Sequence, residues 1–203
     1  MKRIVAFLSI YILGFLSVQA QKDDLKKSFS VDTVSSQILW YCGRHYGCVR
    51  LDTGSVESVN NNIIGGSFIV DMNTVSDDDI TDNNLLRLTL DNVIKSLSFF
   101  NVETFSDSKF KIEEVEKIDS DYYYITGILE IQDVERNISF KSKIVFKENR
   151  IIVDSDIINI DRTNWGVNYL SEKYDPEGKE NMYVPDTISF KVHLFADEIR
   201  NNK

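Results

Sequence analysis

Hydrophobic and polar residues alternate along much of the chain, with the period of two that is typical of β-strands with one buried face. The clearest runs cover 64–72, 125–131, 138–146 and 188–196. In the first run, this alternation places Ile64, Gly66, Phe68, Val70 and Met72 on one inward face. About eight such strands can be counted in this way.

The breaks between strands are short and polar, at 119–121, 132–137 and 148–149. Short connections imply that consecutive strands are antiparallel neighbours. A sheet of about eight antiparallel strands commonly avoids exposed edges by closing on itself. The pattern therefore predicts a mainly β protein, built as an eight-stranded antiparallel barrel.

One segment departs from the β pattern and predicts a helix over about 77–96, packed on or near the mouth of the barrel. Leucine, isoleucine and valine recur at helical spacing between 86 and 97. Ser76 is the expected N-cap, and Asp77, Asp78 and Asp79 are expected in the first turn. The acidic cluster does not have the spacing of a calcium loop, so helix capping is the preferred interpretation.

The first twenty residues have the pattern of a secretory signal peptide, because Lys2 and Arg3 precede an apolar run and Val18-Gln19-Ala20 resembles a cleavage site. We therefore predict a signal peptide at 1–20, an N-terminal extension at 21–37, a binding barrel at 38–203, and a periplasmic or secreted location. No later run is long enough to predict stable membrane insertion. Removing two basic residues takes the formal net charge from −9 to −11, which disfavours nucleic acid as a partner.

Cys42 and Cys48 are the two cysteines, and a local disulfide between them is the preferred prediction for an exported chain. Two free thiols are the alternative. His45 lies midway between them, so a metal site is conceivable, but no fourth ligand is nearby and no metal is predicted. A Cys-His enzyme is a weaker alternative because no nucleophile motif accompanies these residues, so no catalytic residue or cofactor is predicted.

Several blocks resemble, in order, those of the YceI-like family of exported, lipocalin-like polyisoprenoid-binding proteins. They are Trp40 with His45-Tyr46-Gly47, the run 65–73 (GGSFIVDMN), the run 95–102 (KSLSFFNV), the run 126–131 (TGILEI) and the run 160–167 (IDRTNWGV). The resemblance covers about 38–196. It implies a lipocalin-like barrel with a long hydrophobic cavity that holds a long-chain apolar lipid.

The ligand-binding side chains are predicted from their positions on the inward faces of the strands and from this resemblance. They are Phe68, Val70, Phe99, Phe100, Phe110, Ile125, Leu129, Ile131, Phe140, Ile144, Ile158, Ile160, Arg162, Trp165, Phe190 and Val192. Each could instead be ordinary core. For Arg162, a buried ion pair or a clamp on backbone carbonyls is preferred to contact with a lipid head group.

A different class of function is a filled barrel that acts through its surface. Tyr122 and Tyr124 lie on the outward face of their strand and could mark a partner site. Related barrels pair in some cases, so a homodimer is a further alternative.

Overall fold

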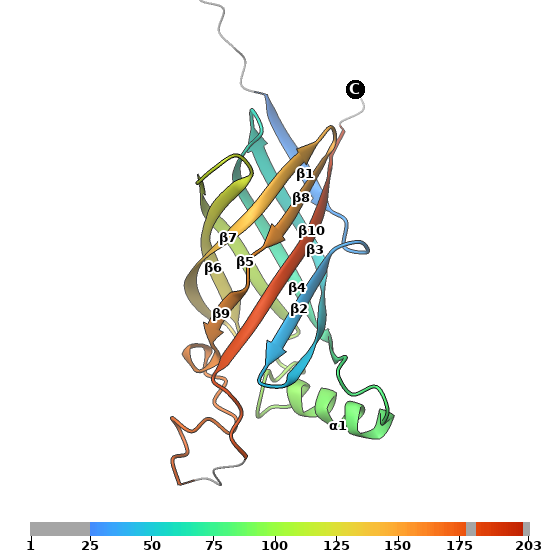
Figure 1. The fold of residues 1–203 in the computed structure, drawn as a ribbon, viewed down its shortest axis with the longest axis vertical. Coiled ribbons are helices and arrows are strands. Elements are labelled where there is room, and N and C mark those ends of the chain that lie inside the picture. The colour runs from blue at the N-terminus through green and yellow to red at the C-terminus, as the bar shows by residue number, and fades with distance from the viewer. Residues whose placement is uncertain (1–24, 178–181, 201–203) are drawn as a thin grey trace, which may run out of the picture.

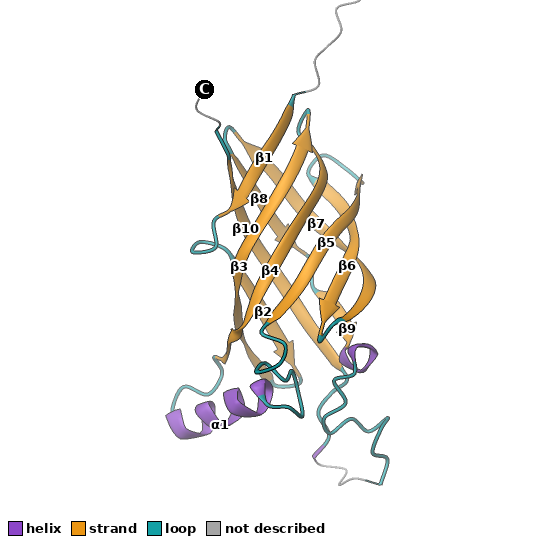
Figure 2. Cartoon of the chain, turned by 180° about the vertical axis from the view of Figure 1, so that it is seen from behind, coloured by secondary structure: helices purple, strands orange, loops and turns teal. Residues whose placement is uncertain are grey.

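The chain forms one closed antiparallel sheet with a helix at one end (Figures 1 and 2). The computed structural model describes residues 25–177 and 182–200. The strands are β1 (Lys26–Val31), β2 (Gln37–Cys42), β3 (His45–Val59), β4 (Asn62–Asp77), β5 (Asp107–Lys117), β6 (Tyr122–Ile131), β7 (Val134–Lys147), β8 (Arg150–Ser155), β9 (Ile158–Asp161) and β10 (Thr187–Glu198). The helices are α1 (Asn84–Lys95) and the short 3-10 helix η1 (Arg162–Trp165).

The ten strands occupy eight positions around the barrel. The hydrogen-bonded ring runs β10-β2-β3-β4-β5-β6-β7-β8, and β8 closes it by pairing with β10. The strands β1 and β2 lie one after the other between β10 and β3. In the same way, β9 continues the line of β8 along β10. The predicted eight-stranded antiparallel barrel is confirmed.

The sheet begins at Lys26, inside the segment that the sequence assigned to an extension preceding the barrel. Phe29 is buried in β1 and pairs with Val56 of β3 and Glu198 of β10. The predicted signal peptide at 1–20 lies outside the described residues.

Tight turns join several neighbouring strands. Asn60 and Asn61, between β3 and β4, both have positive φ, as do Gln132 and Asp133 between β6 and β7. Two successive residues with positive φ are typical of the type I′ turn, whose twist matches that of the strands it joins.

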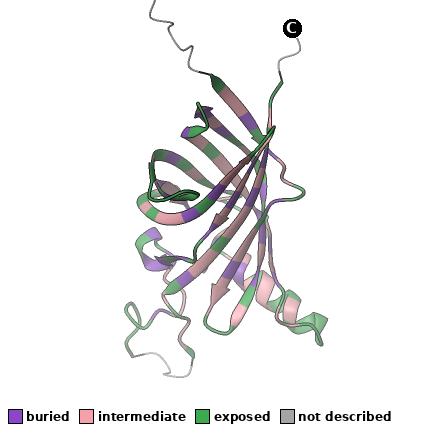
Figure 3. Cartoon of the chain, turned by 45° about the horizontal axis from the view of Figure 1, so that its top comes forward, coloured by how far each residue is buried: buried purple, intermediate pink, exposed green. Residues whose placement is uncertain are grey.

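Buried and exposed residues alternate along much of each strand (Figure 3), and the alternation breaks at register shifts, one of which is a bulge in β4. Ser58 pairs with Ile63 and Glu57 with Gly65, so Ile64 has no partner in the ladder. The extra residue reverses the alternation at that point. The prediction for Ile64 is therefore wrong: its side chain is exposed, and Ile63 is buried instead.

The helix is shorter than predicted and begins later. Asp77 ends β4, because its backbone pairs with Gly47 of β3, so neither Ser76 nor the acidic cluster caps a helix. The N-cap of α1 is Asn83, whose side-chain oxygen accepts a hydrogen bond from the N–H of Leu86 at 3.1 Å.

The two ends of the barrel differ. One buried cluster, around Phe29, Val56 and Ile151, fills the end where β3 turns into β4. A second cluster, around Trp40, Phe99 and Trp165, lies towards the end that carries α1 and η1 (Figure 2). Within the described residues, no helix has the length and apolar character needed to cross a bilayer.

Candidate functional site

The barrel encloses a cavity of about 830 Å³, lined mostly by aliphatic and aromatic side chains. Along β3 it reaches from His45 at the α1 end to Val56. These eleven residue steps correspond to roughly 36 Å along the strand at ~3.3 Å per residue. Met182 lines the cavity and is itself exposed, so the cavity meets solvent at the α1 end.

Most of the predicted ligand-binding side chains line this cavity. The period-two pattern gives the inward face of the strands correctly for those on β4 to β7, β9 and β10, whereas Phe99 and Phe100 follow α1. The predicted side chains that line the cavity are Phe68, Val70, Phe99, Phe100, Phe110, Ile125, Leu129, Ile131, Phe140, Ile158, Phe190 and Val192.

Ile144, Ile160, Arg162 and Trp165 do not line the cavity. Ile144 and Ile160 are buried in the core, where protein side chains surround them. The strand β9 ends at Asp161 and the chain turns into η1. The alternation of a strand therefore does not give the direction of the Arg162 or Trp165 side chain. The indole N–H of Trp165 donates to the carbonyl of Leu129 at 3.1 Å, which fixes η1 against β6.

Arg162 is buried and clamps backbone carbonyls, which is one of the two buried roles expected from the sequence. Its guanidinium donates to the carbonyl oxygens of Val167 (2.5 Å), Tyr169, Val184 and Pro185 (each 2.9 Å). Burial lowers the pKa of this guanidinium from its ordinary value.

The clamp joins two stretches of the loop that follows η1. Tyr169, Val184 and Pro185 also line the cavity, so the same hydrogen bonds hold part of the cavity wall in place. Asp186 adds a carboxylate at 3.4 Å from the guanidinium, with its side chain 29% exposed.

Phe99 and Phe100 follow α1 and pack edge to face, with ring centroids 4.8 Å apart. The amide of Gln132 donates to the carbonyl of Phe99 at 2.7 Å, and the Arg162 guanidinium lies 5.4 Å from the centre of the Phe99 ring. Both phenylalanines are therefore fixed features of the cavity wall near its opening.

Sequence reasoning missed three groups of lining residues. In β2 and β3, hydrophobic and polar residues alternate less regularly than in the other strands. The helix α1 and the loop before β10 are not strands, so a period of two cannot identify their inward side chains. The missed side chains include Ile38, Trp40, Val49, Leu51 and Val56 from β2 and β3, Leu90, Val93 and Ile94 from α1, and Tyr169, Val184 and Pro185 from the loop.

The predicted disulfide is not formed, and both cysteines are free. In the β2–β3 hairpin, Cys42 pairs with His45 and Cys48 pairs with Leu39, so the two thiols are three positions apart along the ladder. They also differ in surroundings: Cys42 lines the cavity, whereas Cys48 lies 3.5 Å from the hydroxyl of Ser76. Burial raises the pKa of the Cys42 thiol.

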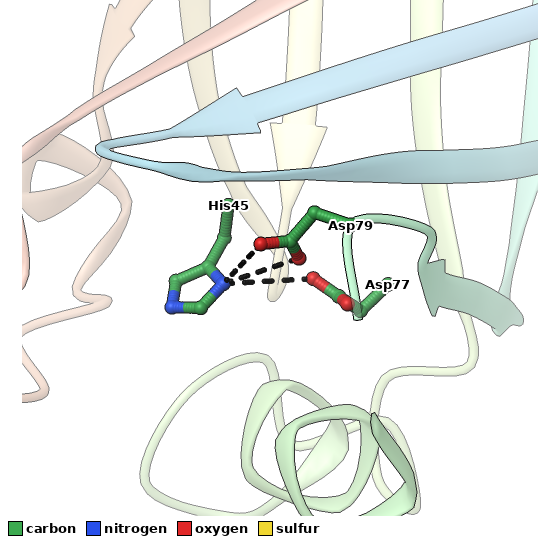
Figure 4. A group of neighbouring side chains, drawn as sticks. All are labelled: His45, Asp77 and Asp79. Carbon is green, nitrogen blue, oxygen red and sulfur yellow. Dashed lines mark hydrogen bonds and ion pairs between the residues drawn. The ribbon is translucent and has the colours of Figure 1, made fainter. Parts of the chain in front are cut away.

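His45 instead lies beside two carboxylates at the edge of the cavity (Figure 4). Its Nδ1 is 3.2 Å from Oδ2 of Asp79 and 3.7 Å from Oδ2 of Asp77. The Asp77 side chain is fully buried. Burial and its contact with Asp79 raise the pKa of Asp77 to about 6. The sequence did not reveal this cluster, because pairing of β3 with β4 is what brings residues 45 and 77 together.

The other histidine, His193, lies on the outer face of β10 and pairs with Asp154. Its side chain is 43% exposed.

Three solved structures share this fold. Burkholderia cenocepacia BcnA is 14% identical, with a TM-score of 0.65 over 81% of this chain and 98% of that chain. A polyisoprenoid binding domain from Saccharophagus degradans, implicated in plant cell wall breakdown, is 13% identical, with a TM-score of 0.60 over 85% and 99%. A Campylobacter jejuni YceI protein is 18% identical, with a TM-score of 0.53 over 69% and 75%.

No curated protein matches the chain at a comparable level of significance. The YceI-like domain model matches residues 26–196, from the first strand to the last. This match agrees with the barrel, the helix at its end and the ordered sequence blocks. The chain therefore belongs to the YceI-like domain family.

Proposed function

We propose that this protein binds one long apolar lipid, of the polyisoprenoid, isoprenoid quinone or fatty-acid type, inside the barrel. The observation that carries the proposal is the unfilled apolar cavity of about 830 Å³. Protein interiors are normally close-packed, with few voids larger than a water molecule. A cavity of this size is therefore better explained by a ligand than by imperfect packing.

The size and shape of the cavity favour a chain over a compact molecule. At roughly 30 Å³ for each water-sized group, the volume holds on the order of 25 such groups. Burial of a methylene group contributes about 0.8 kcal/mol, so a chain of ~20 carbons offers roughly 16 kcal/mol before the costs of ordering are subtracted. Contacts with aliphatic and aromatic walls supply this energy without a catalytic group.

The open end determines the expected orientation of the lipid. Arg44 and His45 line the cavity there, whereas buried Val56 and Ile63 line its far end. A lipid tail is expected to extend towards Val56, with its polar end at the opening beside α1.

The relative from S. degradans is described as a polyisoprenoid binding domain, which supports the isoprenoid class. We propose that the protein acts as a non-enzymatic carrier or store. The leader-like pattern at 1–20 supports export to the periplasm or the outside of the cell.

A pair of tryptophan substitutions tests the proposal. Leu129 lines the cavity, whereas its neighbour Ile128 lies on the outward face of β6. Leu129→Trp should fill part of the cavity and weaken binding of a C20 isoprenoid alcohol at least tenfold. Ile128→Trp adds the same side chain outside and should bind as the parent does.

Binding can be followed by quenching of intrinsic tryptophan fluorescence and checked by isothermal titration calorimetry. A saturated fatty acid of equal length and an isoprenoid quinone serve as competing ligands that separate the three lipid classes. Equal affinity of the Leu129→Trp and parent proteins, with both folded, would show that the lipid does not occupy this cavity.

A further inference from the structure

The cluster of His45, Asp77 and Asp79 combines three side chains that commonly bind transition metals. One ligand atom from each lies within 4.8 Å of the others. An imidazole nitrogen and carboxylate oxygens are the usual nitrogen and oxygen ligands of Zn²⁺ and similar divalent ions.

The two separations from His45 are close to the spacing around a small cation. Nδ1 of His45 lies 3.2 Å from Asp79 and 3.7 Å from Asp77. Two ligands of a tetrahedral ion with bonds of about 2.05 Å are separated by about 3.3 Å. A small movement of side chains would therefore place all three around one ion.

Asp77 supplies an independent observation that points to a ligand. Its Oδ1 accepts a hydrogen bond from the N–H of Ile80 at 3.0 Å. Its Oδ2 is buried and has no hydrogen-bond partner in the part of the chain that the structure describes. This oxygen is one of those that face His45 (Figure 4). Buried charged oxygens are normally hydrogen-bonded, paired or bound to a metal.

The local charge also favours a cation. The charged groups that act on Asp77 are Asp79 and His45. The nearby Asp91 of α1 accepts the backbone N–H of Asp77 at 2.7 Å, which brings a third carboxylate to the same corner of the barrel. No lysine or arginine of the described residues forms an ion pair with Asp77 or Asp79.

We propose that His45, Asp77 and Asp79 form a binding site for one divalent transition-metal ion, such as Zn²⁺, at the mouth of the cavity. The ion would join the β2–β3 hairpin to the end of β4, just before α1. Three protein ligands leave an open position that water or an anionic group can occupy. This proposal does not depend on the lipid that the barrel binds.

The test uses untagged, chelator-treated, lipid-free protein and ZnSO₄ as the probe, in isothermal titration calorimetry near neutral pH. We expect one Zn²⁺ ion per chain and a rise in thermal stability on its addition. His45→Gln and Asp77→Asn should each weaken Zn²⁺ binding more than about tenfold, because loss of even an indirect supporting contact costs 10–100-fold.

Matched controls come from the same chain. His193→Gln removes the other histidine, and Asp82→Asn removes an exposed acid five residues beyond Asp77. Both should bind Zn²⁺ as the parent does. If Asp77→Asn does not fold, Asp79→Asn replaces it, since the Asp79 side chain is 19% exposed.

The absence of stoichiometric Zn²⁺ binding by the folded parent would overturn the proposal. So would unchanged binding in His45→Gln and Asp79→Asn. Failure of lipid binding in the same preparation would bear on the proposed function and leave the metal site unaffected.

Discussion

Replacing Arg162 with Met should be among the most damaging single changes in this protein. The side chain is 1% exposed and donates hydrogen bonds to four backbone carbonyls. Methionine is unbranched and apolar and has no donor, so the substitution removes the hydrogen bonds while it keeps the space of the arginine stem filled.

The expected cost follows from these contacts. Hydrogen bonds to a charged group contribute about 1.5–3 kcal/mol each, so four would amount to roughly 6–12 kcal/mol. Two effects reduce this loss. Water can reach some of the loop carbonyls after the substitution, and the free energy cost of burying the charged guanidinium is no longer present. We therefore expect a net loss of about 3–5 kcal/mol in the free energy of unfolding, the range found when one partner of a buried charged pair is removed.

Urea unfolding followed by circular dichroism measures this loss, and thermal unfolding should show a melting temperature lower by about 6–20 °C for a domain of this size. Arg150→Met is the matched control. Arg150 pairs with Asp197 and Asp32 at the surface, where its side chain is 38% exposed, so its loss should cost about 1 kcal/mol or less.

The Arg162 substitution should also loosen the cavity wall formed by Tyr169, Val184 and Pro185, and so accelerate release of a bound lipid. A loss of less than about 1 kcal/mol, equal to that of Arg150→Met, would refute the view that the clamp holds the loop in place.

Three further predictions concern backbone geometry and the cysteines. Gly47→Ala should destabilise the protein by about 2 kcal/mol or more in urea unfolding, because the new Cβ would lie 1.9 Å from a backbone oxygen of β4. Gly65→Ala, with no atom within 4 Å of its Cβ, should change stability by less than about 0.5 kcal/mol and serves as the control. Asn83→Ala should cost about 1 kcal/mol through loss of the N-cap of α1, and an unchanged unfolding free energy would contradict this. Thiol titration of the denatured, unreduced protein should give two free thiols, from Cys42 and Cys48, whereas a disulfide would give none.

The strands could be predicted from the sequence because each has one face in the barrel interior and one in solvent. In β10, Ile188, Leu194 and Ala196 are buried, whereas Lys191 on the other face is exposed, which is the alternation that the sequence shows. Short turns then require antiparallel neighbours, and closure of the sheet follows from the number of strands.

The fold predicted from the sequence was wrong at features that a local hydrophobic pattern does not contain. The bulge at Ile64 inserts one residue and reverses the inward face, with no change in hydrophobicity to signal it. Asp77, Asp78 and Asp79 looked like a helix start, but pairing of Asp77 with Gly47 extends β4 through this position. A long-range hydrogen-bonded ladder outweighed the capping preference of the segment.

The parts of the candidate site that lie on the inward faces of strands could be predicted from the sequence. Strand parity identified the inward side chains of β4 to β7, whereas α1 and the loop before β10 line the cavity through tertiary packing. Arg162 was assigned to a strand face because Ile158 and Ile160 precede it, but the chain leaves the sheet after Asp161. The cluster around His45 required the register between β3 and β4, which the sequence does not provide.

The cavity of about 830 Å³ is the proposed binding site of one lipid. Native mass spectrometry of the protein purified under mild conditions, before and after incubation with a bacterial lipid extract, tests this proposal most directly. We predict one added lipid mass per chain, removed by organic extraction and reduced in Leu129→Trp but retained in Ile128→Trp. A folded protein that remains at its bare polypeptide mass after incubation with the extract would contradict the proposal.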